Sequence, residues 1–106
     1  MKMYTNESQT AKLIELGFDE PRLLYFGNNT IGHYAYTIGE LIEMLPGVLA
    51  PSNNDDWEMP LSISSDSFMW TVEYDGGYFR PYEAASNELI DALYDMVVKL
   101  KEEGVI

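Results

Sequence analysis

The sequence predicts a single α+β domain in which an antiparallel sheet of three to five strands packs with three helices. Three observations predict this class: two segments open with helix-capping patterns, a central stretch alternates apolar and polar residues, and the C-terminal segment has a wide apolar helical face. A chain of 106 residues is the size of one compact domain. We therefore expect residues 1–106 to share one hydrophobic core.

The first expected element is a helix that runs from Glu7 to Leu16. Asn6 and Gln9 have the three-residue spacing of a capping box, and Gly17 stands where a residue with positive φ commonly ends a helix. The side expected to be buried carries Ala11, Leu13, Ile14 and Leu16.

Two short strands and a second helix are expected next. The apolar run 23–26 predicts one strand and 33–36 its return, because the Gly and Asn residues between them tolerate positive φ. Thr37 and Glu40 form a second capping-box pattern, so a helix is expected through 41–45, where a Pro-Gly pair ends it. A helix of about two turns needs tertiary packing to hold it.

The middle of the chain has the clearest strand pattern. Residues 61–64 and 68–74 alternate apolar with polar side chains, which predicts a half-buried antiparallel hairpin that turns near 65–66. A polar loop is expected before it, over 50–60, and a third strand after it, over 78–82, where a proline confines it to a sheet edge. The face that we expect the last helix to cover bears Phe68, Trp70 and Val72.

The segment 87–103 predicts the longest helix. Ser86 is the expected N-cap, and Gly104 with Val105 has the pattern of a Schellman ending. So wide an apolar face indicates a helix that lies across a sheet or is contacted on two sides. Its apolar residues are Leu89, Ile90, Ala92, Leu93, Met96, Val97 and Leu100.

The charge balance excludes several classes of function. With 6 Lys and Arg against 18 Asp and Glu, the formal net charge is −12. A non-specific nucleic-acid binder needs basic residues to neutralise phosphates, and attraction to an anionic lipid surface needs them too. We therefore expect neither direct nucleic-acid binding nor membrane binding.

The residue types also constrain compartment and chemistry. The chain holds no cysteine, which excludes disulfides, thiolate metal sites and cysteine nucleophiles. The first residues lack an apolar run of signal-peptide length, and no segment approaches the roughly 20 apolar residues of a spanning helix. We expect a cytoplasmic location.

Four blocks of the sequence carry a family resemblance. They are residues 11–17, 36–46, 70–74 and 89–104, which hold a capped helix start, a Trp-containing strand and the closing helix. In this order and spacing they resemble small acidic uncharacterised proteins of gut Bacteroidetes, often encoded near phage or conjugative elements. The resemblance implies a bacterial, cytoplasmic α+β domain and carries over no catalytic residue.

Two patterns resemble ligand-binding motifs but lack residues that those motifs need. Residues 27–32 have the glycine spacing of a phosphate-binding loop, yet His33 and Tyr34 stand where Lys and Ser or Thr are required. The oxygen-bearing residues in 53–58 do not fit an EF-hand, so we expect a solvated loop, with weak calcium or magnesium binding as the alternative. We assign no catalytic, cofactor-binding or metal-binding residue and expect no cofactor.

The loop around Trp57 is the expected partner-binding segment. Trp57 either folds back onto the domain and pins this acidic loop, or projects from it as an anchor, since Trp is enriched among interface hot spots. The candidate partner-binding residues are Trp57, Asp55, Asp56 and Glu58.

Two classes of function remain open on the sequence. The first is a non-enzymatic acidic module that binds a protein partner, an accessory factor of a bacterial or mobile-element genome; its sharper version is a nucleic-acid mimic that inhibits a basic host protein. The second is a small ligand-binding protein or enzyme that uses His33, the only histidine, as a general base oriented by a carboxylate. Self-association into a homo-oligomer is compatible with either class.

Overall fold

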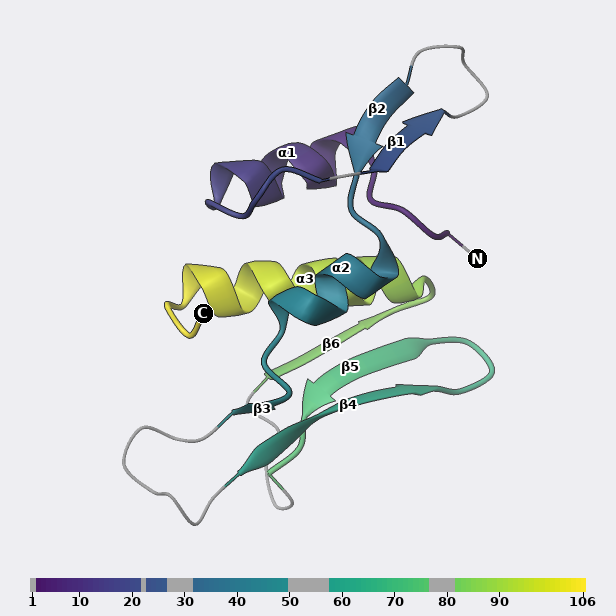
Figure 1. Ribbon diagram of the computed structural model, residues 1–106. Coiled ribbons are helices and arrows are strands. Elements are labelled where there is room, and N and C mark those ends of the chain that lie inside the picture. The colour runs from purple at the N-terminus through teal and green to yellow at the C-terminus, as the bar shows by residue number, and fades with distance from the viewer. Residues whose placement is uncertain (1, 22, 27–31, 50–57, 77–81) are drawn as a thin grey trace.

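The computed structural model describes residues 2–21, 23–26, 32–49, 58–76 and 82–106, and for 23–26 and 32–33 it describes the backbone. Three helices and six strands occur in the described part, and they confirm the predicted α+β class (Figure 1). In chain order they are α1 (Glu7–Glu15), β1 (Leu23–Phe26), β2 (Gly32–Ala35), α2 (Ile38–Met44), β3 (Val48–Leu49), β4 (Met59–Ser65), β5 (Trp70–Tyr74), β6 (Tyr82–Ser86) and α3 (Leu89–Glu102).

The elements form layers. A four-stranded antiparallel sheet has the order β3-β4-β5-β6, and β1 with β2 forms a separate two-stranded sheet. Helices α2 and α3 cover one face of the larger sheet, and α1 lies beyond them with β1 and β2 (Figure 1). The opposite face of the larger sheet carries no described helix (Figure 1).

Helix α1 confirms its predicted caps and corrects its predicted buried side. Both hydrogen bonds of the Asn6–Gln9 capping box form, and Gly17 has a φ of 99°. The buried residues are Thr10 and Leu13, whereas Ala11 and Ile14 are exposed and Leu16 is half-buried. The buried side of α1 is narrow because the helix packs chiefly against β2. The Thr10 hydroxyl is accommodated there by its hydrogen bonds to Thr5 and to the Asn6 carbonyl.

Helix α2 begins and ends as its sequence predicts. Thr37 and Glu40 make both bonds of the capping box, and the helix ends at Met44, two residues before Pro46. Tyr36 and Leu41, on either side of the cap, are both buried in the core. A helix this short is held by packing, chiefly against α3.

The hairpin of β4 and β5 corrects two predicted boundaries. Met59 and Pro60, expected in a loop, begin β4 because Met59 points into the core and pairs with Leu49 of β3, a two-residue strand that the sequence analysis missed. Strand β5 begins at Trp70, so Phe68 lies in the turn and is 84% exposed, contrary to its predicted burial. Trp70 packs against the core, and Val72 is fully buried, as predicted.

Strand β6 is displaced from its prediction. The third strand expected over 78–82 overlaps β6 only at Tyr82, and residues 77–81 lie outside the described part of the chain. The pairing with β5 continues through Ser86, which is the ladder partner of Trp70, and the strand packs against α3. Its place at the end of the strand order confirms the predicted edge position.

Helix α3 has the predicted apolar face but a different start. Ser86 belongs to β6, and the N-cap is Glu88, whose side chain makes no capping bond; the Ser86 hydroxyl instead accepts a 3.3 Å hydrogen bond from the Glu88 amide. All seven predicted apolar residues are buried. Contacts with α2, β5 and β6 surround the helix on two sides, as so wide an apolar face requires. At its end, Gly104 (φ 75°) and the bond from the Val105 amide to the Leu100 carbonyl complete the predicted Schellman ending.

Candidate functional site

The predicted partner-binding loop is only partly visible. Trp57, Asp55 and Asp56 lie outside the described residues, so the two fates of Trp57 and the cation-binding alternative stay predictions. Glu58, the last residue of that set, is exposed and directly precedes β4.

The His33 hypothesis is likewise untested. The backbone of His33 pairs with Tyr25 between β1 and β2, as the predicted returning strand requires, but its side chain and the loop 27–31 lie outside the described part. Its neighbour Tyr34 is 55% exposed, whereas Tyr36 is buried and donates a 2.5 Å hydrogen bond to the Asp19 carbonyl. Burial, followed by the charges of Glu40, Asp19 and Glu20, raises the pKa of Tyr36, so this phenol stays protonated and acts as a structural donor.

An acidic hollow of about 210 Å³ lies beside Tyr36. Its rim carries Asp19, Glu20, Glu40 and Glu43, and its apolar part carries Phe18 and Met44. Nowhere among the described residues do three or more His, Asp or Glu side chains gather closely enough to hold a metal ion. The Glu40 carboxylate accepts a hydrogen bond from the Thr37 amide in the capping box of α2, so this side chain stabilises the start of the helix.

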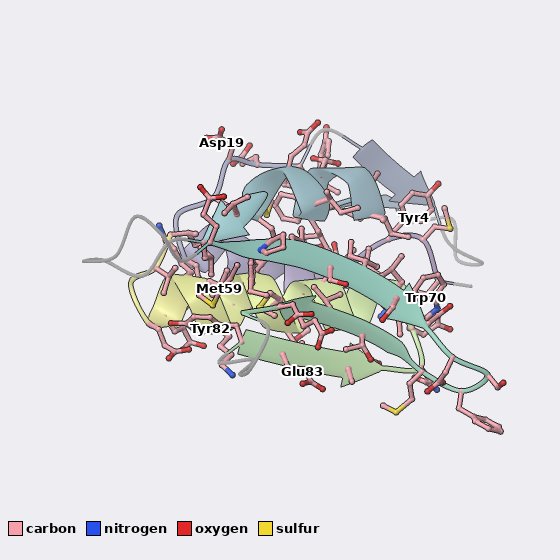
Figure 2. All side chains as sticks on the ribbon, turned by 90° about the horizontal axis from the view of Figure 1, so that it is seen from below. Tyr4, Asp19, Met59, Trp70, Tyr82 and Glu83 are labelled. Atoms are coloured by element: carbon pink, nitrogen blue, oxygen red, sulfur yellow. The ribbon has the colours of Figure 1, made fainter. Side chains whose placement is uncertain are left out.

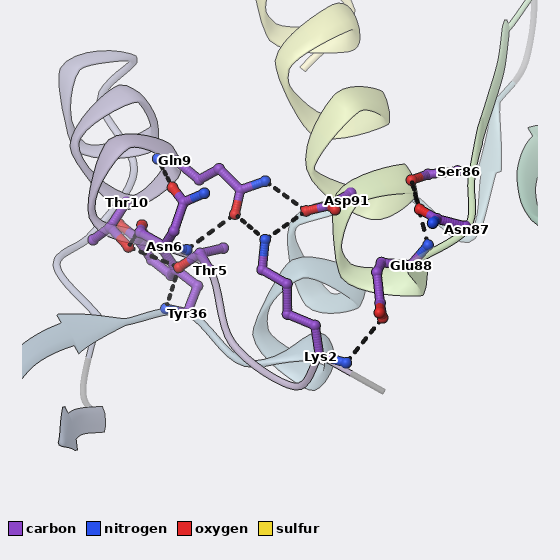
Figure 3. A network of polar contacts seen from close by, with 10 residues as sticks. All are labelled: Lys2, Thr5, Asn6, Gln9, Thr10, Tyr36, Ser86, Asn87, Glu88 and Asp91. Carbon is purple, nitrogen blue, oxygen red and sulfur yellow. Dashed lines mark hydrogen bonds and ion pairs between the residues drawn. The ribbon is translucent and has the colours of Figure 1, made fainter. Parts of the chain in front are cut away.

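A polar network fastens the N-terminal segment to α3 (Figure 3). The Asp91 carboxylate accepts hydrogen bonds from Lys2 Nζ at 2.9 Å and from Gln9 Nε2 at 2.7 Å, and the Lys2 amide donates to Glu88 at 2.8 Å. Burial raises the pKa of Asp91, but the hydrogen bonds from Lys2 and Gln9 and the charge of Lys2 outweigh it and hold the pKa below its usual value. These contacts join residues far apart in sequence, so their role is structural.

The face of the larger sheet that no described helix covers is a further candidate surface (Figure 1). Two rows of side chains cross it from β4 through β5 to β6: in register they are Ser62, Glu73 and Glu83, and then Ser64, Thr71 and Ala85. We call these six residues the open face. Ser64, Glu83 and Ala85 are exposed, and the other three residues are half-buried. Glu83 lies on β6, at the edge of the sheet (Figure 2). A flat sheet surface of this kind suits contact with another macromolecule better than enclosure of a small molecule.

The β4–β5 turn extends the same sheet. It projects past the end of the neighbouring strands (Figure 1) and carries two exposed apolar side chains, Phe68 at 84% and Met69 at 43%. Asp66 orders it: one carboxylate oxygen accepts the amides of Phe68 and Met69, both at 2.8 Å. These two hydrogen bonds lower the pKa of Asp66, which therefore remains ionised at neutral pH.

Charge is distributed unevenly over the described residues. Their cationic side chains are Lys2, Lys12, Lys99 and Lys101, which belong to the N-terminal segment, α1 and α3. Lys99 and Lys101 lie over the rings of Tyr82 and Phe18, at 5.7 Å and 5.5 Å from the ring centres. Strands β3 to β6 and the β4–β5 turn carry Asp66, Glu73 and Glu83 and no cationic residue.

Sequence reasoning placed a turn near 65–66 but missed the exposure of Phe68, because the apolar–polar alternation of β5 extends to this residue. The signal that would have found it is Asp66, since an Asp at the start of a turn commonly accepts the amides that follow. Four residues of the open face, Ser62, Ser64, Thr71 and Glu73, are polar members of the predicted alternation, whereas Glu83 and Ala85 lie beyond the third strand that was expected over 78–82.

In the described part of the chain, no helix is long and apolar enough to cross a membrane. The chain matches no protein-family model, no curated protein and no solved structure.

Proposed function

We propose that this chain is a non-enzymatic, acidic protein-binding module whose open face docks on a basic surface of another protein. The observation that carries the proposal is the one-sided charge of the sheet: Glu73 and Glu83 stand in the same cross-strand row, and no lysine or arginine shares the described strands with them. A basic surface on a partner protein complements the negative charge of these two carboxylates.

The shape of the surface supports a protein rather than a small molecule as the ligand. Four of the six residues of the open face have short side chains, and the other side of β5 and β6 packs against α3. A partner can therefore contact this face without displacing the described helices. Rigid, electrostatically complementary surfaces give fast and selective association.

The wider setting belongs to the same proposal. The resemblance to small acidic proteins of gut Bacteroidetes supports a bacterial, cytoplasmic accessory role near mobile elements. A net charge of −12 supports the sharper version, in which the carboxylates take the place of nucleic-acid phosphates in a basic groove.

Affinity capture with a charge-reversal pair tests the proposal. The immobilised chain is exposed to lysate of its native cells, and bound proteins are quantified by mass spectrometry at about 0.05 M and about 0.5 M salt, which spans strong to weak screening of surface charges. We expect a discrete basic protein that is retained at low salt, released at high salt and lost with Glu83→Lys. The matched control is Glu15→Lys, an exposed glutamate on α1, which should retain it.

Capture of acidic or neutral proteins alone, or of none, contradicts the proposal. Equal loss with Glu83→Lys and Glu15→Lys would assign the effect to total charge and contradict the role of the open face. Competition by duplex DNA separates the two versions, because DNA displaces the partner only if the chain occupies a nucleic-acid-binding groove.

A further inference from the structure

We propose that Phe68, supported by Met69, is the apolar anchor of this interface and inserts into an apolar pocket bordered by basic residues on the partner protein. The inference rests on the proposed function and adds the residue that gives the contact its affinity. Its starting observation is that Phe68, at 84% exposed, is the most exposed large apolar residue among those described.

Hydrogen bonds within the turn fix the exposed position of Phe68. The Asp66 carboxylate holds the amides of Phe68 and Met69, and the Asp66 amide donates a 3.0 Å hydrogen bond to the Met69 carbonyl. These three bonds close the turn and fix the backbone from which Phe68 projects. A preorganised aromatic side chain loses little conformational entropy on binding, which is the property expected of an anchor.

The neighbouring strands extend this tip into a larger contact surface. The first ladder pair behind the turn joins Ser65 to Trp70, and the open-face row that contains Thr71 follows directly. Trp70 packs against the core, so the base of the hairpin is anchored to the fold while its tip is free. Protein interfaces commonly have an apolar core and a polar rim. The apolar tip of the turn would be such a core, and the polar, charged open face beside it such a rim.

Charge decides among the possible occupants of this surface. A second copy of the chain would bring another net charge of −12 against Asp66, Glu73 and Glu83, and an anionic lipid surface would repel them as well. A protein with basic residues around an apolar pocket complements the net charge of −12 and accommodates the Phe68 ring. We therefore commit to that occupant.

Two linked measurements test the anchor. In the capture experiment, the retained basic protein is compared between the original chain, Phe68→Ser and the matched control Ile42→Ser, which alters an exposed apolar residue of α2. We expect Phe68→Ser to lower the retained amount by about tenfold or more, as for an interface hot spot, and Ile42→Ser to leave it within about twofold. Phe68→Leu, which keeps an apolar side chain, should recover part of the binding.

Photo-crosslinking identifies what Phe68 touches. A benzoylphenylalanine at position 68 should crosslink to the same basic protein that the original chain captures, whereas the same group at position 42 should not. A crosslinked product of two copies of this chain, or of the chain with lipid, overturns the choice of occupant.

The failures of the two proposals are distinguishable. If the original chain captures no basic protein, the proposed function fails and the anchor with it. If it does capture one and Phe68→Ser binds equally well, the anchor alone fails. The melting midpoints of Phe68→Ser and Ile42→Ser are measured as well. If they match that of the original chain, a loss of binding is not caused by unfolding of the variant.

Discussion

At the scale of single residues, Asp91 and Asp95 show how neighbours set the ionisation of two carboxylates one turn apart on α3. Asp91 is held by Lys2 and Gln9, which lower its pKa. Partial burial, and then the negative charge of Asp91, raise the pKa of Asp95. The same substitution at the two positions should therefore have opposite effects on stability.

Asp91→Asn should destabilise the protein at neutral pH by about 1 kcal/mol, because it removes a charge-assisted hydrogen bond and a partly buried ion pair. The pKa of Asp91 in the folded state lies below its pKa in the unfolded chain. The stabilisation by the ionised carboxylate is therefore complete above about pH 4 and is lost as the pH falls through the folded-state pKa. Urea unfolding at pH 7 and at about pH 2 measures the difference. An equal loss at both pH values would contradict the ionic origin.

Asp95→Asn should stabilise the protein at neutral pH, by up to about 0.5 kcal/mol for a side chain this exposed. The pKa of Asp95 in the folded state lies above that in the unfolded chain, so the loss of stability begins as the pH rises past the unfolded-state pKa and is complete above the folded-state pKa. Below about pH 4 both states hold the proton and the gain should vanish. A destabilised variant at pH 7 would show that Asp95 makes a favourable contact.

At the scale of elements, Gly39 and Gly104 differ in what they contribute to their helices. Gly104 has a φ of 75° in the Schellman ending of α3, a conformation that strains any other residue. Gly39 lies inside α2, and a Cβ there would meet only Thr37 Oγ1 at 3.8 Å, an ordinary contact. One glycine is therefore required by geometry and the other is not.

Gly104→Ala should lower the free energy of unfolding by about 1 kcal/mol, whereas Gly39→Ala should raise it by about 0.5–1 kcal/mol, because alanine favours helix and restricts the unfolded chain. Thermal and urea unfolding of both variants measure the two signs. Gly39→Ala is the control for the loss of glycine itself. Two destabilised variants would show that α2 tolerates no added methyl group.

The elements also show which structural features the sequence could predict. Both capping boxes, the Schellman ending and the buried face of α3 depend on residues close together in the chain, and all were confirmed. Strand β3 and the range of β6 depend on pairing partners far away, which local periodicity does not register. Phe68 was misplaced for a different, local reason: the amides of Phe68 and Met69 donate to the Asp66 carboxylate and form a turn, which overrides the alternation that continues through Phe68.

At the scale of the whole molecule, the two sides of the main sheet have different roles. One side packs against α3 around Val72 and Tyr74, whose hydroxyl donates a 2.6 Å hydrogen bond to the Pro46 carbonyl and whose pKa burial raises to about 12. The other side carries Glu73 and Glu83 and continues into the exposed turn. The alternation of apolar and polar residues in β5 predicted that one side of the sheet is polar, but the exposure of Phe68 was seen only in the structure.

The candidate site shows the same division between local and non-local information. Glu58 was predicted from the acidic loop and is exposed, but Phe68 and the Glu73–Glu83 row come from turn geometry and strand register. The predicted roles of Trp57 and His33 stay predictions, because their side chains lie outside the described part of the chain.

Amide hydrogen exchange of the full chain, alone and bound to the captured basic protein, tests the central claim most directly, since it maps the interface without any substitution. The account predicts slower exchange in the bound state at residues 65–70 and 82–86, with α1 and β2 unchanged. Protection confined to α1 and α2, with no change in the β4–β5 turn, would contradict the assignment of the open face and its Phe68 tip as the binding surface.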